Sequence, residues 1–175
     1  MIQYADSEFY VRDSTPDDIP LYTQLLRNEE WLFNSGFKKD EYLEDTQILQ
    51  FLTKEHPQDI KWVCFHGDKG FVSFVHFNVI SEDCALAIGG LVPRYLNSGW
   101  GLKYYAWCID LYFKMGLREK VRSNVYQENL RSCKMNIGLG FELVGLKLFG
   151  DFKFDVYETY RERFYHSPLV MRILR

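Results

Sequence analysis

The sequence predicts an α/β fold of the α+β kind, with a mixed, mostly antiparallel central sheet flanked by helices. Two pairs of apolar strands are joined by short turns that contain glycine, which is typical of antiparallel hairpins. A long amphipathic helix follows another strand, so helices are expected to cover the sheet. Because the chain has no repeat, low-complexity segment or linker, we expect residues 1–175 to form one domain.

The predicted order of elements is β-α-α-β-β-β-α-β-α-β-β, and the first third of the chain supplies one strand and two helices. Residues 9–12 form the strand. Residues 14–18 carry a capping hydroxyl, an early proline and two acids, which together indicate a helix start. Residues 31–37 are predicted to be a loop rich in aromatic side chains, and a second helix is expected over residues 40–54.

The middle of the chain predicts three strands of the sheet. Residues 61–66 and 70–78 form a hairpin around the glycine turn at residues 67–70. Both faces of the second of these strands are apolar, so we expect it to lie in the centre of the sheet. A further apolar strand is expected at residues 84–92.

The second half of the chain begins with the long helix at residues 101–115. One of its stripes is apolar, whereas Lys103, Asp110 and Lys114 are expected to face water. The remaining predicted elements are a strand at residues 117–126, a short helix at 128–138 and a hairpin formed by residues 141–149 and 152–161.

Composition and charge exclude several classes of protein. A net charge of −3 and a pI of about 5.8 give no positive field that would attract nucleic acid. No apolar run is long enough to span a membrane, and the N-terminus lacks the features of a signal peptide. The four cysteines have neither paired nor zinc-type spacing, so we expect no metal, no disulfide and a cytoplasmic location.

The loop Leu96-Asn97-Ser98-Gly99-Trp100-Gly101 is the most informative motif. It lies between an apolar strand and the start of the long helix, where backbone N–H groups and about half a positive charge from the helix dipole favour an anion. Its glycines allow close approach of a diphosphate. A tight turn without a ligand is the simpler alternative. A dinucleotide or P-loop site is disfavoured, because the third glycine and the Gly-Lys-Ser/Thr sequence are absent.

Two further motifs strengthen the first. The run NLRSCKMNIGLGF, residues 129–141, has an Asn, a Ser three residues later and a closing Gly-Phe. The run FELVGLKLFGDFKFDVY, residues 141–157, forms the final hairpin. With the glycine loop, these motifs resemble the GCN5-related N-acetyltransferase (GNAT) superfamily, in the branch that acetylates ribosomal-protein N-termini, polyamines and amino sugars.

This resemblance implies that acetyl-coenzyme A is the co-substrate. Backbone amides at residues 97–102 would hold its diphosphate, and Leu91 and Val92, at the end of the strand before the loop, would pair with the pantetheine amides. Gly89 and Gly90 would form a β-bulge that separates this strand from its neighbour. Asn129 and Ser132 would hydrogen-bond the arm, although a helix cap and an exposed hydroxyl are the alternatives. The expected cofactor contacts are Leu91, Val92, Asn97, Ser98, Gly99, Trp100, Gly101, Leu102, Asn129 and Ser132.

One catalytic position departs from the pattern of the superfamily. Seven residues after Asn129, many members carry a tyrosine that protonates the leaving thiolate, whereas this chain has Asn136. An amide can hydrogen-bond the sulfur but cannot act as an acid. Either the thiolate leaves unprotonated, since a thiol has a pKa of about 8.5, or another group supplies the proton. The alternative donors are Tyr104, Tyr105, Tyr126 and Tyr157.

The group that accepts the proton of the amine is left open. Glu82, at the entry to the strand that lines the cleft, and His76, near the end of the preceding strand, are the two candidates for a general base. A solvated turn acid and a sheet histidine are the alternatives for these two residues. Asp155 is a third candidate with a structural alternative.

The resemblance therefore predicts an enzyme that transfers an acetyl group to a primary amine by direct attack in a ternary complex. A catalytically silent domain that binds or senses acyl-coenzyme A is the alternative, and Asn136 favours it. The acceptor is a small-molecule amine or a protein N-terminus; amino sugars and polyamines also stay open. In the superfamily the segment corresponding to residues 31–37 usually shapes this pocket. The oligomeric state is undecided, with a homodimer as one option.

Overall fold

The computed structural model describes residues 2–5, 9–36 and 43–175. Its strands form one eight-stranded sheet in the order β1-β2-β3-β4-β5-β6-β8-β7, in which all neighbours are antiparallel except β5 and β6. The predicted fold class is confirmed. The strands are β1 (Ile2–Ala5), β2 (Phe9–Asp13), β3 (Ile60–His66), β4 (Gly70–Val79), β5 (Cys84–Leu91), β6 (Lys120–Tyr126), β7 (Glu142–Phe149) and β8 (Phe152–Tyr160).

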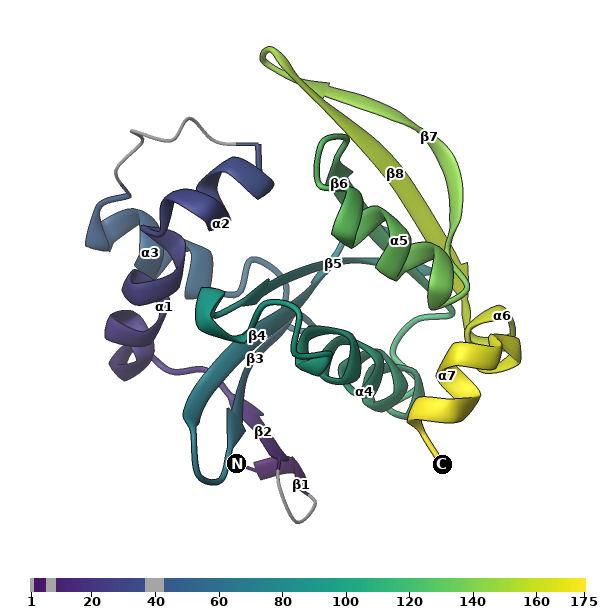
Figure 1. Ribbon diagram of the computed structural model, residues 1–175, viewed down its shortest axis with the longest axis horizontal. Coiled ribbons are helices and arrows are strands. Elements are labelled where there is room, and N and C mark those ends of the chain that lie inside the picture. Colours follow the sequence, from purple (N-terminus) through teal and green to yellow (C-terminus); the bar gives the residue numbers. More distant parts are fainter. Residues whose placement is uncertain (1, 6–8, 37–42) are drawn as a thin grey trace.

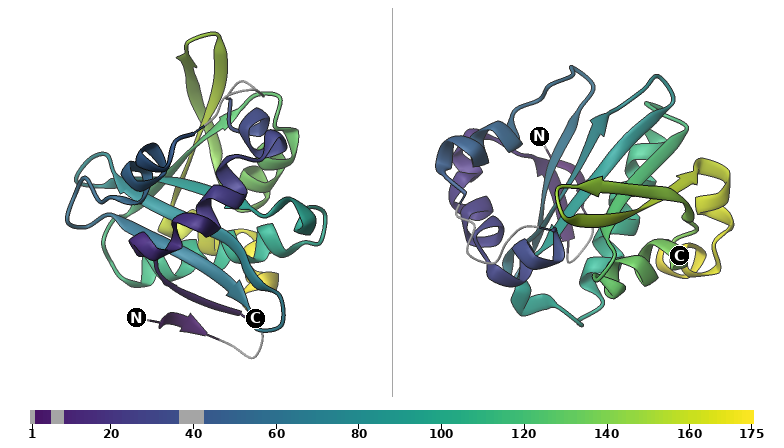
Figure 2. Two further views of the ribbon diagram at one scale, coloured as in Figure 1. Left: turned by 90° about the vertical axis from the view of Figure 1, so that its left-hand side faces the viewer. Right: turned by 90° about the horizontal axis from the view of Figure 1, so that it is seen from above.

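Helices cover both faces of the sheet (Figures 1 and 2). The first three helices pack on one face of β3 and β4, and α4 packs on the other face with the C-terminal helices. Apolar side chains on both faces of β4 explain its central place. The helices are α1 (Ile19–Leu26), α2 (Glu29–Asn34), α3 (Asp45–Leu52), α4 (Trp100–Lys114), α5 (Leu130–Gly138), α6 (Arg161–His166) and α7 (Pro168–Ile173).

The segment predicted as an aromatic loop is largely helical. Asn28 caps α2, because its side-chain oxygen accepts hydrogen bonds from the N–H groups of Glu30 and Trp31. Acidic residues in the first turn favour the same helix. Phe37 and residues 40–42 of the next predicted helix lie outside the described residues, and α3 begins at Asp45. The short elements β1, α6 and α7 were not predicted.

Asp110 does not face water as predicted. Its exposure is 6%, because α6 covers this side of α4 and the Tyr165 hydroxyl donates a hydrogen bond to Asp110 Oδ1 over 2.9 Å. The ammonium of Lys114, one turn later, lies 2.8 Å from Asp110 Oδ2. A partnered carboxylate can be buried at this position.

The sheet divides between β5 and β6. The two strands pair over four positions, from Cys84 opposite Lys120 to Ala87 opposite Ser123, and then separate. No bulge causes this separation, because the pairing of β4 with β5 is regular through Gly89 and Gly90. The predicted bulge is therefore wrong.

Close packing explains Gly90 instead. A Cβ atom at this position would lie 2.5 Å from the ring of Phe74, 2.7 Å from Trp31 Nε1 and 2.9 Å from Leu25. These atoms leave no room for a larger residue on this face of β5, so helices α1 and α2 can approach the strand closely.

Candidate active site

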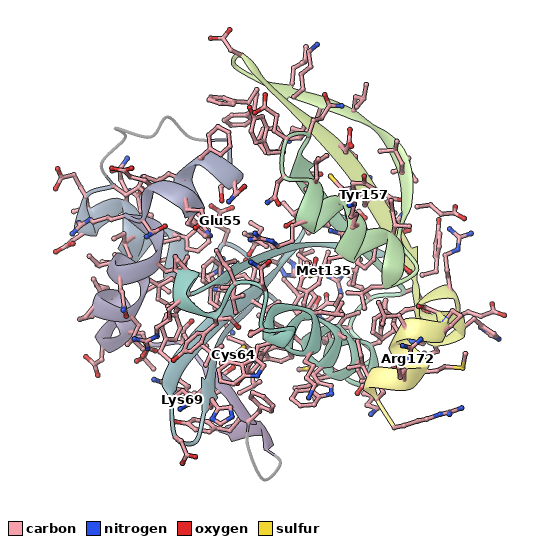
Figure 3. The ribbon with its side chains drawn as sticks, in the orientation of Figure 1. Glu55, Cys64, Lys69, Met135, Tyr157 and Arg172 are labelled. Atoms are coloured by element: carbon pink, nitrogen blue, oxygen red, sulfur yellow. The ribbon has the colours of Figure 1, made fainter. Side chains whose placement is uncertain are left out.

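A cavity of about 840 Å³ lies where β5 and β6 separate. Successive residues of a strand point to opposite faces of a sheet, and residues of β5 from both faces line the cavity. Ile88 and Gly90 face helices α1 to α3, whereas Ala87, Gly89 and Leu91 face α4. The cavity therefore passes through the sheet and connects its two faces. Met135 on α5, labelled in Figure 3, lines the wall contributed by that helix.

The predicted glycine loop forms one end of this cavity. Asn97 and Gly99 adopt positive φ angles of 65° and 82°, which turn the chain tightly into α4. In the described part of the chain, no group accepts a hydrogen bond from the N–H of Gly99, Gly101 or Leu102. All three residues line the cavity, so the start of α4 presents unpaired donors to it.

Ser98 and Trp100 fasten the loop. The Ser98 hydroxyl donates to the carbonyl of Tyr95 over 2.6 Å and accepts from the N–H of Trp100 over 3.1 Å. The indole of Trp100 stacks on His66, with ring centroids 4.6 Å apart. Neither Ser98 nor Trp100 lines the cavity. Of the predicted loop contacts, these two hold the backbone, and the others face the cavity.

The two predicted contacts at the end of β5, Leu91 and Val92, differ in where their backbone groups point. The N–H of Val92 donates to Val72 over 2.8 Å, its carbonyl accepts from Tyr95, and its side chain is buried. The prediction that Val92 pairs with a ligand therefore needs correction. Because hydrogen bonding alternates along an antiparallel pair, the backbone groups of Gly89 and Leu91 point away from β4, toward the side that β6 has left.

The Asn129 side chain lines the cavity and makes two hydrogen bonds within the protein. Its Oδ1 caps α5 by accepting from the N–H of Ser132 over 3.1 Å, and its Nδ2 donates to the carbonyl of Asn34 over 3.1 Å. Asn129 is thus a helix cap and ties α5 to the end of α2. Ser132 lines the cavity, and its hydroxyl has no hydrogen-bond partner among the described residues.

Two cationic side chains that were not predicted from the sequence line the cavity. Arg131 and Lys134 lie on α5 on either side of Ser132 and are exposed. Their positions next to a predicted contact on a short helix were the available signal. Both can neutralise phosphate at the mouth of the cavity.

No protein-family model matches the sequence, and no curated protein sequence is significantly similar to it. Solved structures do match. A spermidine N-acetyltransferase from Vibrio cholerae, in complex with CoA and spermine, has a TM-score of 0.79 and 14% identity, over 92% of this chain and 100% of that one. A ribosomal alpha-N-protein acetyltransferase in complex with coenzyme A has a TM-score of 0.75 and 16% identity, over 91% and 98% of the two chains.

A GNAT-family acetyltransferase from Streptococcus pneumoniae has a TM-score of 0.69 and 16% identity, over 87% of this chain and 99% of that one. This chain has the GNAT fold. The predicted resemblance is confirmed at the level of the fold, and the site residues can be considered within it.

Within the GNAT fold, the Asn136 amide is turned toward its own helix. Its Nδ2 donates to the carbonyl of Ser132 over 2.9 Å, and the buried Oδ1 has no hydrogen-bond partner in the described part of the structure. The residue borders the cavity with an exposure of 1%. One N–H of the amide that was expected to face sulfur is thus bonded to the helix, and the nitrogen keeps a second N–H.

The candidate bases do not meet in the cavity. Glu82 lies in the exposed turn between β4 and β5, outside the cavity lining. His76 is fully buried, its Nε2 shares a hydrogen bond of 2.7 Å with the Tyr22 hydroxyl, and its Nδ1 has no partner among the described residues. Burial and the nearby charge of Lys61 hold the pKa of His76 well below its usual value. Asp155 accepts hydrogen bonds from Gln127 and Tyr157, as a structural residue would.

The candidate tyrosines differ in their surroundings. Tyr104 lines the cavity, but its hydroxyl donates to the carbonyl of Phe65 over 2.8 Å. Tyr105 and Tyr126 also line the cavity, and burial raises the pKa of Tyr105 to about 12. Tyr157 lies outside the lining, and burial raises its pKa strongly. Tyr105, beside Ser123, and Tyr126, beside Glu128, are the candidates that line the cavity without a bond to the backbone.

Among the described residues, no group of three or more His, Cys, Asp or Glu side chains could hold a metal ion. Within the same ranges, none of the helices combines the length and the apolar character needed to cross a membrane.

Proposed function

We propose that the protein transfers the acetyl group of acetyl-coenzyme A to a primary amine. The observation that carries this proposal is the set of unpaired N–H groups of Gly99, Gly101 and Leu102, which open into a cavity that crosses the sheet. A diphosphate fits the donors, and a slender arm fits the space that β6 has left. The GNAT fold of the structural neighbours, two of which were solved with coenzyme A, supports the same assignment.

The chain's own residues suggest how the co-substrate would be held. The diphosphate would accept hydrogen bonds at the start of α4, with Arg131 and Lys134 near its phosphates. The pantetheine amides would pair with the backbone of Gly89 and Leu91, and the Ser132 hydroxyl would supply one more hydrogen bond. The thioester would then lie where the pairing of β5 and β6 ends.

The reaction proceeds by direct attack. The neutral amine nitrogen forms a bond to the thioester carbonyl carbon, the carbon–sulfur bond breaks, and the sulfur leaves with its electron pair as a thiolate. One proton leaves the amine, and the thiolate takes up one proton to become the thiol. The four cysteines are buried free thiols, which supports a ternary complex rather than an acylated enzyme and agrees with the proposed cytoplasmic location.

Binding and turnover test this proposal in two steps. Calorimetry with coenzyme A and acetyl-coenzyme A should show binding of both, and release of free thiol should depend on an added primary amine. Absence of binding would overturn the assignment of the glycine loop. Thiol release at the same rate with and without amine would overturn amine transfer and indicate a thioesterase.

The pH dependence of kcat/KM tests the missing base. Glu82 and His76 do not line the cavity, and Glu30, the one carboxylate in the described lining, lies beside Arg131. We therefore expect kcat/KM to rise with pH through the deprotonation of the acceptor itself. With acceptor amines of different pKa, the midpoint of this rise in kcat/KM should shift by the difference between their pKa values. Glu82→Gln should leave the midpoint unchanged. A midpoint that is the same for all of the amines would instead reveal a base on the enzyme.

A catalytically silent domain that binds acyl-coenzyme A is the second candidate. The engaged amide of Asn136, at the position where many members of the superfamily carry an acid, favours it. Binding of acetyl-coenzyme A with no thiol release in the presence of any primary amine would establish this alternative.

The oligomeric state remains a prediction. Strand β7 is an edge strand, and it exposes Leu146, Leu148 and Phe149 by 69–70%. Such a surface is one that a second copy could cover. Light scattering on the purified protein distinguishes a monomer from a homodimer.

A further inference from the structure

The part of the cavity on the α1–α3 face of the sheet is walled by apolar side chains. We call it the acceptor chamber. It is formed by Leu26, Trp31, Ile48, Phe51, Phe74 and Ile88, which belong to α1, α2, α3, β4 and β5.

Aromatic rings make up much of this wall. The rings of Phe51 and Phe74 meet edge to face with centroids 5.5 Å apart, and Trp31 lies 6.4 Å from Phe74. Phe74 is fully buried, whereas Trp31 and Phe51 are half-buried and also border the cavity. Rings that keep exposed surface in a concave site favour an apolar or aromatic ligand group.

The described lining offers little negative charge to a polycation. Among the described residues that line the cavity, Glu30 is the one carboxylate, and Arg131 and Lys134 are cations. The Glu30 carboxylate lies 3.9 Å from the Arg131 guanidinium, and both side chains are about half exposed at the rim. Because the phosphates of the co-substrate would neutralise Arg131 and Lys134, a ligand with several ammonium groups would meet a single carboxylate, Glu30, in the described lining.

From this chamber we propose that the acceptor is a primary amine attached to an apolar group that carries a ring. This inference rests on the proposed acetyl transfer and names the class of its acceptor. The ring occupies the acceptor chamber, and the amine nitrogen points through the sheet toward the end of the β5–β6 pairing. Apolar walls disfavour the charged ammonium, so the amine is bound in the neutral form that attacks the thioester.

The same chemistry has two sources: a free arylalkylamine, or a peptide whose first residue has an aromatic side chain. Acetylation by the full-length protein should be measured with 2-phenylethylamine, ethylamine and spermidine, and with two short peptides that begin with phenylalanine or with aspartate. We expect kcat/KM for 2-phenylethylamine or the phenylalanine peptide to exceed that of ethylamine and spermidine by about tenfold or more. The better of the first two identifies the source. Spermidine or ethylamine equal to or better than both would overturn the proposal.

A binding measurement keeps the inference separate from the proposed transfer. If no amine is acetylated but coenzyme A binds, calorimetry of the protein–coenzyme A complex still compares 2-phenylethylamine with ethylamine. Tighter binding of 2-phenylethylamine supports the chamber even though the transferase assignment fails. Equal binding of the two amines overturns the proposal that the acceptor chamber binds the ring.

A variant pair locates the ring. Phe51→Ala should raise the KM for 2-phenylethylamine about tenfold, change the KM for ethylamine little and leave the affinity for coenzyme A unchanged. Leu49→Ala is the matched control, because Leu49 lies on the same helix, is exposed and is not part of the lining. If Phe51→Ala does not bind coenzyme A, Phe51→Leu, which keeps most of the volume without the ring, replaces it. An unchanged KM for 2-phenylethylamine in the variant that binds coenzyme A would overturn the placement of the ring.

Discussion

The two ends of the cavity are built from different parts of the chain. At the start of α4, backbone N–H groups face the cavity, and glycines give the loop its shape. In the acceptor chamber, side-chain rings and aliphatic groups form the walls. The first end depends on backbone conformation and tolerates changes of side chain, whereas the second depends on side-chain identity.

The largest effect is expected from a substitution at the start of α4, the end of the cavity that is formed by backbone N–H groups. Gly101→Val places a Cβ atom 3.1 Å from the Leu91 side chain and adds bulk beside the unpaired N–H groups. We expect the Kd for coenzyme A to rise about 100-fold, because each hydrogen bond to a charged group contributes about 1.5–3 kcal/mol. Calorimetry measures this change. Gly145→Val is the control, since no atom lies within 4 Å of its added Cβ; equal weakening in both variants would contradict the placement of the diphosphate.

Two adjacent glycines test the two faces of β5 separately. Gly90→Ala puts a Cβ atom 2.5–2.9 Å from Phe74, Trp31 and Leu25, and should lower the free energy of unfolding by about 1–3 kcal/mol. Gly89→Ala meets its nearest atom at 3.6 Å on the other face, and should leave stability unchanged or slightly raised. Urea unfolding compares the variants. A larger loss for Gly89→Ala would show that the two faces have been assigned wrongly.

The buried histidine that packs against the acceptor chamber should make the stability of the protein depend on pH. His76 is neutral in the folded protein, because burial beside Tyr22 and the charge of Lys61 lower its pKa well below 6.5. In the unfolded chain it binds a proton below about pH 6.5. Stability should therefore fall as pH drops below this value, by up to about 1.4 kcal/mol per pH unit.

Urea unfolding between pH 7 and pH 5 measures this slope, and His76→Gln should reduce it. Asp18 and Asp83 have lowered pKa values, so their contributions to stability are lost at more acidic pH and leave this window clear. An unchanged slope in His76→Gln would mean that another group binds the proton.

The smallest effect is expected at Asn136. Asn136→Ala removes one hydrogen bond to the Ser132 carbonyl and, with it, the second N–H of the same nitrogen, which is the donor left for sulfur. A neutral hydrogen bond contributes about 0.5–1.5 kcal/mol, so kcat should fall tenfold or less. Single-turnover measurements with saturating acetyl-coenzyme A test this. Abolished turnover with unchanged coenzyme A affinity would give Asn136 a direct part in the reaction.

The fold and the cofactor end follow from local signals in the sequence. Hairpin turns such as the one at Gly70, and the passage from strand to glycine loop to helix, are set by residues close together in the chain. Gly99 and Gly101, which these signals single out, line the cavity. Even so, the signals did not separate residues that face the cavity from Ser98 and Trp100, which fasten the loop through their side chains.

The remaining features depend on contacts between distant segments. Asn129 binds the carbonyl of Asn34, which lies 95 positions earlier, and no local pattern announces that contact. Asp110 is buried by Tyr165, on a helix that the sequence did not predict. The acceptor chamber combines residues from three helices and two strands, so its chemistry appears only once they are assembled. Glu82 and His76 were chosen by their positions on strands, and position alone does not bring a side chain into a cavity.

Because β5 separates from β6, part of β5 is paired on one side only. Beyond Ala87, β5 is a central strand on its β4 side and an edge strand on its other side. Exposed strand edges recruit strands from other molecules and lead to aggregation. Here the edge faces the cavity, whose walls leave less room for a strand of another molecule than an open sheet edge does. Hydrogen exchange along β5 should therefore alternate, with slow amides at Ile88 and Gly90 and faster ones at Gly89 and Leu91 that slow when a ligand fills the cavity.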